Sequence, residues 1–220
     1  MTDELQRIVA GAFRLAAAKP WADVTLAEIA SEAGLSLADL PRHINGKADI
    51  IVAYAKDVNA KTLRSVEADP VEGEQHDRLF DVLLRRFEII KDDKAALASI
   101  YHAAPTSPSE RRQLLIAALE GQGWVLAAAG LSPSGFEGDA IRLMLTKVQA
   151  DVFKVWLEDD DPGLARTMAA LDRKLRDGER YLRMLERPIS IGAALYRAFR
   201  SLRENPKSSS QDNRADDTAD

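Results

Sequence analysis

Cysteine is absent from this sequence of 220 residues, which excludes disulfides and thiolate metal ligands. Aromatic residues make up 6% of it, and its 12 glycines and 9 prolines are too few for frequent turns. No apolar run approaches the roughly 18 residues of a membrane-spanning helix, and the first residues do not form a secretion signal. We therefore expect a soluble, cytoplasmic protein.

Positive charge does not predominate, since 30 lysine and arginine residues are outnumbered by 35 aspartate and glutamate residues. The net charge is −5 at pH 7, which predicts no strong overall attraction to DNA. What the sequence does contain is a hydrophobic share of 46%, carried mainly by alanine and leucine, and a charged share of 30%. Apolar residues recur with helical periodicity, and no segment alternates apolar and polar residues as a strand does. The predicted fold class is therefore all-α.

The boundaries of the predicted helices come from caps and breakers. Thr25 with Glu28, and Ser107 with Glu110, form capping boxes at helix starts, and Pro108 suits the first helical position. A short third helix begins at either residue 36 or residue 39 and ends before Asn45. The predicted helices cover residues 5–18, 25–33, 36 or 39–44, 48–68, 76–91, 95–102, 108–129, 139–157, 162–186 and 189–202.

The first 47 residues have the layout of a helix-turn-helix: a helix, a glycine turn and a short capped helix within about 25 residues. This spacing also occurs in ordinary helical bundles, so the residues themselves matter. They closely resemble the N-terminal signature of the tetracycline-repressor (TetR) family. The residues that carry the resemblance are 25–36 (TLAEIASEAGLS), Leu40, Arg42, His43, Ile44, Lys47, Ile50 and Ile51.

The resemblance implies an N-terminal DNA-binding domain (1–47), a helical ligand-binding and dimerisation domain (48–204) and a polar, disordered tail (205–220). The implied protein is a homodimeric, ligand-responsive transcriptional regulator that binds a palindromic double-stranded DNA operator and a hydrophobic small molecule. Thr25 would offer its hydroxyl and nearby amides to a phosphate. Ser36, Leu37, Ala38 and Arg42 would face the major groove, while His43 and Lys47 would contact the DNA backbone. The alternative is that these residues are only caps and solvated charges.

Three features depart from the family pattern. Pro41 stands where the family has a phosphate-contacting tyrosine, and in a helix that began at Ser36 it would remove the bond to the Leu37 carbonyl. A start at Asp39 would tolerate Pro41 but shorten the helix. Ile44 replaces a phenylalanine. Residues 1–50 contain five basic and seven acidic residues, a poor balance for a domain that must neutralise phosphates.

Two C-terminal helices have apolar residues at alternating steps of four and three, a spacing typical of seams that pack as knobs into holes. The seams pair helices within one chain or, as in TetR-like proteins, form a four-helix dimer interface, which we predict here. The predicted interface residues are Ile141, Leu145, Val148, Val152, Leu171, Leu175, Gly178 and Leu182.

The segments 156–167 (WLEDDDPGLART) and 170–174 (ALDRK) resemble a second family, the TetR-fold ubiquinone-biosynthesis accessory proteins, which bind lipids. That resemblance implies an alternative function: a lipid- or isoprenoid-binding accessory protein with a vestigial helix-turn-helix. The predicted last helix, 189–202, has an apolar stripe with arginines opposite and no acidic residue, a composition that suits a membrane surface. It could equally close the core.

No catalytic constellation is present, so we predict no enzyme. His43, His76 and His102 are far apart and lack carboxylate partners at ligand spacing, so neither a metal site nor a cofactor is expected. Asp161 is predicted to cap the helix that Pro162 begins. A ligand pocket is predicted on the middle helices, although each of its residues could be ordinary core. The pocket residues are Phe87, Tyr101, His102, Trp124 and Phe153.

Overall fold

A computed structural model describes residues 1–103, 107–180 and 182 of the chain. The chain divides into a unit Met1–Gly178 and a unit Glu179–Asp220, of which residues 179, 180 and 182 are described. The described residues are helical and contain no strand, which confirms the all-α prediction. The predicted helix 189–202 and tail 205–220 lie outside the described residues. Among those described, no helix has both the length and the apolar content needed to cross a membrane.

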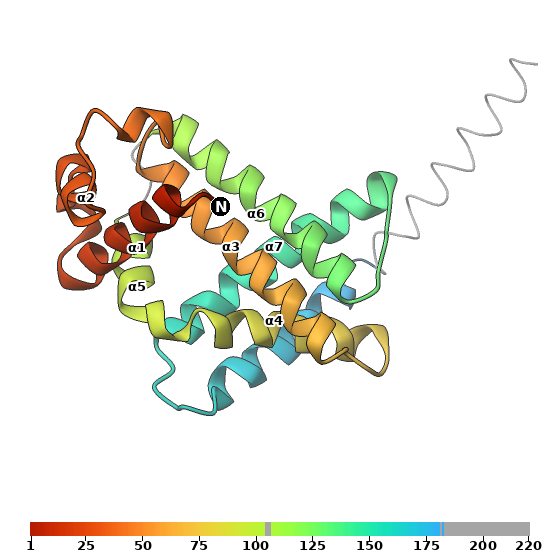
Figure 1. The fold of residues 1–220 in the computed structure, drawn as a ribbon. Coiled ribbons are helices and arrows are strands. Elements are labelled where there is room, and N and C mark those ends of the chain that lie inside the picture. The colour runs from red at the N-terminus through yellow and green to blue at the C-terminus, as the bar shows by residue number, and fades with distance from the viewer. Residues whose placement is uncertain (104–106, 181, 183–220) are drawn as a thin grey trace, which may run out of the picture. The chain divides into compact units, whose positions relative to one another are not determined.

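The helices appear in Figure 1 in chain order, with three short 3-10 turns between them. The α-helices are α1 (Asp3–Ala18), α2 (Leu26–Glu32), α3 (Lys47–Ala68), α4 (Gln75–Ile89), α5 (Lys94–His102), α6 (Pro108–Ala128) and α7 (Gly135–Leu157). The 3-10 turns are η1 (Trp21–Asp23), η2 (Leu40–Arg42) and η3 (Lys91–Asp93). A further helix, 165–180, follows α7.

The helix starts follow from local capping. Thr25 and Glu28 form the predicted capping box of α2, and Ser107 and Glu110 form that of α6 with Pro108 in its first turn. Each box satisfies two backbone amides that a helix start leaves unpaired. After α2, Gly34 adopts a left-handed φ of +68°, a conformation that glycine takes without strain. This turn directs the chain away from α2.

The predicted third helix is reduced to the 3-10 turn η2. Asp39 precedes it, so the later of the two predicted starts is the closer one. Pro41 has no amide hydrogen to donate to the Leu37 carbonyl, which prevents an α-helix from running from residue 36 through residue 44. The amides of Arg42 and His43 bond instead to carbonyls three residues back. The segment that was predicted to read DNA bases thus forms a series of tight turns.

Two other boundaries differ from the prediction. Helix α7 begins at Gly135, four residues early. The next helix begins at residue 165 and not at Pro162, because the Asp161 carboxylate accepts hydrogen bonds from the amides of Gly163 and Ala165 in a turn before the helix. Leu164 in that turn has a φ of +54°, so helical backbone cannot start before it.

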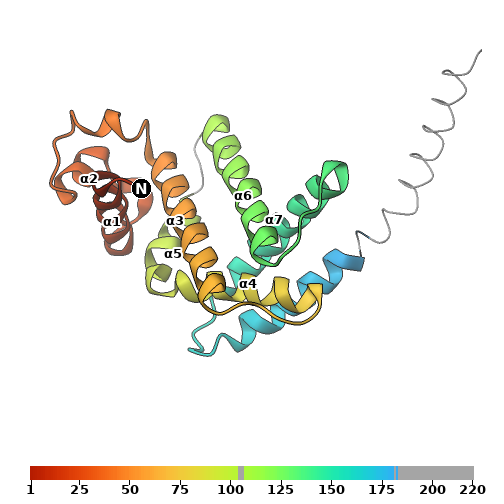
Figure 2. The same ribbon diagram turned by 45° about the vertical axis from the view of Figure 1, so that its right-hand side comes forward.

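Two apolar cores hold the unit Met1–Gly178 together. The first lies mainly in the head, which we define as residues 1–46, and also includes Ile50 and Ala53 of α3 and Ala96 of α5. The second lies among the helices that follow the head, which we call the body. Tyr54 and Leu97 pack against both. Helix α3 packs against α1, α4 and α6, as Figures 1 and 2 show. Because α3 begins under the head and continues into the body, it joins the two cores.

Candidate DNA interface and ligand-binding core

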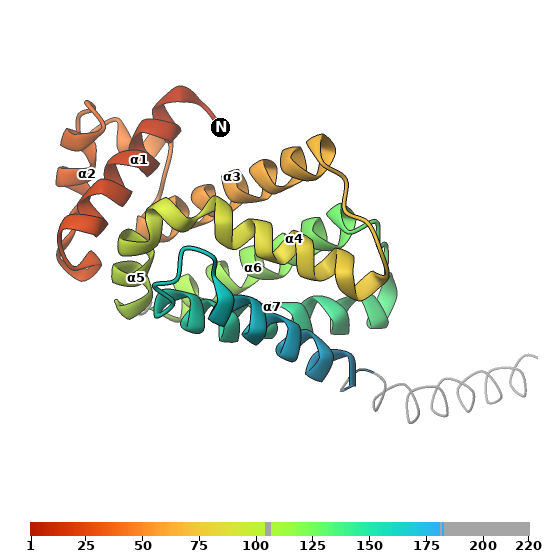
Figure 3. The ribbon, with the colours of Figure 1, turned by 90° about the horizontal axis from the view of Figure 1, so that it is seen from below.

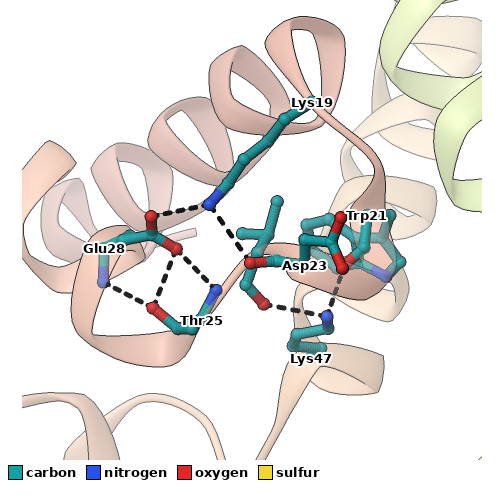
Figure 4. A network of polar contacts seen from close by, with 7 residues as sticks. Lys19, Trp21, Asp23, Thr25, Glu28 and Lys47 are labelled. Atoms are coloured by element: carbon teal, nitrogen blue, oxygen red, sulfur yellow. Dashed lines mark hydrogen bonds and ion pairs between the residues drawn. The ribbon is translucent and has the colours of Figure 1, made fainter.

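The start of α2 is already occupied by a carboxylate (Figure 4). The Thr25 amide and hydroxyl both donate to Glu28 Oε2, at 2.9 and 2.8 Å, and Lys19 Nζ donates to Glu28 Oε1 at 2.6 Å. The Lys19 bond, followed by those from Thr25, lowers the pKa of Glu28 to about 2. A phosphate at Thr25 would therefore meet a negative charge and committed donors, so the structure does not provide the phosphate site predicted there.

Lys47 points into the head. Its Nζ donates to the carbonyls of Trp21 at 2.5 Å and Val24 at 2.9 Å, and it lies 4.6 Å from the centre of the Trp21 ring (Figure 4). Burial lowers the pKa of Lys47. These contacts fix η1 against the start of α3. The ammonium group of Lys47 thus satisfies two protein carbonyls, and its contact with the DNA backbone stays a prediction.

His43 also turns toward the protein. Its side chain is 15% exposed, and Nε2 lies 3.1 Å from a carboxylate oxygen of Glu4 in α1. Ser36 donates from its hydroxyl and its amide to Asp39 Oδ2, at 2.5 and 3.2 Å, and these bonds lower the pKa of Asp39. His43 thus contacts Glu4 of α1, where a contact with the DNA backbone was predicted. Ser36 forms its hydrogen bonds locally, with Asp39.

Three predicted DNA-binding residues remain exposed. Leu37 is 55% exposed, Ala38 is exposed, and the Arg42 side chain is 79% exposed with its nearest carboxylate, that of Asp39, at 3.6 Å. The other cations of residues 1–50, all of which are described, bond within the head. In addition to Lys19 and Lys47, Arg7 donates to the Ala33 carbonyl and Arg14 pairs with Glu32 at 2.7 Å. Arg42 is therefore the residue best placed to meet a phosphate or a base.

Ser99 in α5 connects the head to the body, a contact that the sequence analysis did not anticipate. Its hydroxyl accepts from the Trp21 amide at 2.8 Å and donates to the Lys19 carbonyl at 3.1 Å. On α3, Tyr54 donates to Asp93 at 2.7 Å and stacks on Phe13 with ring centres 4.1 Å apart. Burial raises the pKa of Tyr54, so it stays protonated as a donor. A displacement of α5 would thus be transmitted directly to η1.

Four of the five predicted pocket residues form a chain of rings around Trp156. Phe87 and Phe153 lie 5.8 and 5.4 Å from Trp156, and Tyr101 lies 5.8 Å from Phe153 and 5.5 Å from His102. Phe87 and Trp156 are fully buried, whereas Tyr101 and His102 are exposed. The apolar end of this chain lies in the body core.

Trp124 does not join these rings. It is 53% exposed and lies with Leu143 along a groove of about 730 Å³ between α6 and α7. The predicted pocket is therefore divided between the body core and a surface groove.

The body core also contains polar groups that the sequence analysis missed. Arg86 in α4 is 7% exposed, and its Nη1 donates to Asn59 Oδ1 in α3 at 2.6 Å. Gln122 in α6 is 3% exposed and donates to Gln149 in α7 at 2.7 Å. Arg86 Nε and Gln122 Oε1 are buried without a hydrogen-bond partner in the structure. A signal for Arg86 exists in the sequence, since it falls on the apolar stripe of α4.

Most residues of the predicted dimer seam are buried within the chain, between α7 and the helix that follows it, whose ribbons Figure 3 shows. Five of its residues, Leu145, Val148, Val152, Leu171 and Leu175, are at most 5% exposed and belong to the body core. A methyl group on Gly178 would collide with the Met144 side chain, so α7 and helix 165–180 also approach closely there. Ile141 and Leu182 are partly exposed. For the five core residues the intramolecular alternative therefore holds in this chain.

The segment that resembles the lipid-binding accessory proteins caps helix 165–180. Asp159 is 2% exposed, and its Oδ2 accepts from the amide and hydroxyl of the fully buried Thr167, at 2.8 and 2.7 Å. The Asp159 carbonyl accepts from Lys94 Nζ at 2.7 Å. These residues therefore have a structural role. Among the described residues, no group of three His, Asp or Glu side chains could hold a metal ion.

Similarity to solved structures defines the class of fold. One similar chain is described as a TetR transcriptional regulator from Rhodococcus sp. RHA1, with 20% identity, a TM-score of 0.63, and coverage of 80% of this chain and 95% of that one. Another is the TetR transcriptional regulator from Nitrosomonas europaea ATCC 19718, with 18% identity, a TM-score of 0.64, and coverage of 80% and 97%. No protein-family model matches the sequence. No curated protein matches it. The chain has the TetR-like fold that the motifs of its head predicted.

Proposed function

We propose that this protein is a ligand-responsive transcriptional regulator that binds a palindromic operator as a homodimer. Residues 1–47 would bind DNA, and the rest of the chain would bind a small molecule and pair two copies. The observation that carries the proposal is the exposed surface of Leu37, Ala38 and Arg42 on a helix-turn-helix head. The similarity to two TetR transcriptional regulators supports it. The proposed function involves no catalysis.

The connection through Ser99 supports ligand control. A regulator of this kind responds when a ligand binds one arrangement of head and body better than another. Ser99 bonds both the last carbonyl before Pro20 and the first amide of η1, so α5 holds the head at two adjacent points. A ligand in the body core that moves α5 would change the spacing of two heads in a dimer, and with it the affinity for a palindrome.

Arg42 makes the proposal testable through salt dependence. A dimer that uses one arginine per head neutralises about two phosphates, so the logarithm of affinity should fall with the logarithm of salt concentration with a slope near −2. Fluorescence anisotropy with labelled DNA from upstream of the gene would measure it. Arg42→Ala should weaken binding about 10-fold or more. Lys154→Ala, which removes an exposed charge from α7, is the matched control. Equal affinities of the two variants would exclude this surface as the DNA interface.

A second candidate function is favoured by Pro41 and by the commitment of Thr25, His43 and Lys47 to protein groups. These features suit a lipid- or isoprenoid-binding accessory protein whose head no longer binds DNA. Residues 189–202 would then contact a membrane surface. Flotation of the full chain with anionic liposomes, lost on deletion of 189–202, together with no DNA complex at low salt, would establish this alternative over the first.

A further inference from the structure

The interior of the body holds a positive charge with no negative partner. Arg86 is 7% exposed, and within the described residues its guanidinium makes one hydrogen bond, to the neutral side chain of Asn59. Its Nε is buried without any partner. Burial lowers the pKa of Arg86 to about 10, which leaves the side chain charged at neutral pH. A buried charge of this kind is costly unless an anion compensates it.

The free edge of the guanidinium has the geometry that a carboxylate needs. Asn59 occupies Nη1, which leaves Nε and Nη2, the two nitrogens whose N–H bonds point the same way. Two parallel N–H donors on one edge of an arginine are the usual partners of the two oxygens of a carboxylate. Asn59 therefore orients the arginine and leaves its bidentate edge available.

At Gly121 the backbone of α6 presents no side chain to that edge. Gly121 lies opposite the pair, and a methyl group added there would lie 3.6 Å from Asn59 Oδ1 and 3.9 Å from Arg86 Nη2. The surroundings are apolar: Val58, Leu83, Phe87 and Val125 belong to the same core.

We propose that Arg86 and Asn59, beside Gly121, bind the carboxylate of a small apolar acid within the body. This inference rests on the proposed function in that the acid would be the regulator's ligand, and it replaces a purely hydrophobic ligand with an amphipathic one. The site is closed in this conformation, so α6 moves relative to α3 and α4 when the acid enters. Helix α4 continues through η3 into α5, which holds the head at Ser99.

The test uses the full chain and a panel of straight-chain monocarboxylates from propionate to palmitate, each compared with the primary alcohol of the same length. Binding is measured by calorimetry without DNA. At least one acid should bind more tightly than its alcohol. A panel in which no acid binds more tightly than its own alcohol would overturn the proposal.

Two glycine variants provide the matched comparison. Gly121→Ala and Gly123→Ala each add one methyl group to α6, and neither methyl would come closer than 3.6 Å to its neighbours. Both should fold and gain helix stability similarly. Gly121→Ala should weaken acid binding about 10-fold or more, while Gly123→Ala, whose methyl faces Arg142, should leave it unchanged. Equal effects of the two variants would contradict the site.

Replacing both polar partners separates recognition from structure. The double variant Arg86→Met/Asn59→Leu removes the charge and its one partner together, so no buried polar group is left behind from the pair. We expect its melting temperature to equal or exceed that of the natural chain, and its acid binding to fall about 100-fold. A lower melting temperature with acid binding intact would assign the pair a purely structural role. Because DNA takes no part, loss of DNA binding and loss of acid binding are scored independently.

Discussion

Asp159 provides the sharpest test of how the C-terminal helix is held, because one buried carboxylate oxygen accepts two hydrogen bonds from one buried residue. In Asp159→Ala, the amide and the hydroxyl of Thr167 both lose their acceptor in a site closed to water. A hydrogen bond to a charged group contributes about 1.5–3 kcal/mol, so the two together predict a loss of about 3 kcal/mol or more. For a chain of this length that lowers the melting temperature by about 6–12 °C.

The neighbouring residue supplies the control. Asp160 is fully exposed and lies 3.6 Å from Lys94, so Asp160→Ala removes the same charge from the same turn without leaving a buried donor. Calorimetry or circular dichroism should show no measurable change for Asp160→Ala and the full loss for Asp159→Ala. Equal melting temperatures for the two variants would refute the assignment of Asp159 as the anchor of helix 165–180.

The same carboxylate predicts a pH dependence. The hydroxyl and amide of Thr167 lower the pKa of Asp159 below its ordinary value, so the folded state binds the proton less readily than the unfolded state. The stabilisation is therefore complete above the unfolded pKa of about 4 and is lost as the pH falls through the lower folded pKa. The difference in melting temperature between the natural chain and Asp159→Ala should stay constant from about pH 8 to pH 5 and shrink below about pH 4. A constant difference in acid would mean that the charge of Asp159 does not contribute.

Three further variants test the head and the proposed dimer. Pro41→Ala restores the amide that can bond to the Leu37 carbonyl, so it should slow hydrogen exchange over residues 38–44 and, in a DNA-binding head, raise affinity for the operator. Lys47→Ala should lower the melting temperature by about 4–8 °C, as expected for two lost hydrogen bonds of about 1 kcal/mol each, and leave the salt slope of DNA binding unchanged; a slope reduced by about two, one for each copy in the dimer, would show a phosphate contact instead. Leu143→Glu, on the outward face of α7, should give a monomer by light scattering, while Leu115→Glu on α6 should remain dimeric.

The helix boundaries were the most predictable part of the fold because they depend on neighbours in sequence. A threonine or serine three residues before a glutamate fixes the starts of α2 and α6 whatever packs around them. Pro41 acts just as locally. A shortened third helix was predicted from Pro41. The observed shortening is greater, because the segment retains only the 3-10 turn η2.

The direction in which side chains point was not predictable from spacing. The seam of α7 and the following helix has a repeat that pairs helices, but the repeat carries no information on whether the second helix belongs to the same chain. Lys47 and His43 sit where family resemblance places DNA contacts, and their actual partners, the Trp21 carbonyl and Glu4, come from elements that meet them only in the folded head. Long-range contacts of this kind require the tertiary structure.

The burial of Arg86 could have been predicted from the apolar periodicity of α4. The apolar stripe of α4 passes through Leu79, Val82, Leu83 and Phe87, and Arg86 lies on it at the same helical spacing. A cation on an apolar stripe means either that the predicted register of the helix is wrong or that the charge is buried and has a function. The predicted pocket consisted of aromatic residues and one histidine, so the position where a cation interrupts the stripe was missed.

The distribution of cations over the head and the body bears on which of the two proposed binding sites has the stronger physical basis. In the head, four of the five cations of residues 1–50 bond to protein groups and Glu28 fills the start of α2, so the surface left for an anion reduces to Arg42. In the body, Arg86 has no anionic partner among the described residues, and exclusion from water makes its demand for one stronger. Ligand binding in the body therefore has the stronger physical basis. DNA binding depends on two copies of the head binding together, because two linked heads on one palindrome bind with a higher overall affinity than a single head. Dimerisation is thus a condition for the regulator, whereas the acid site requires a single chain.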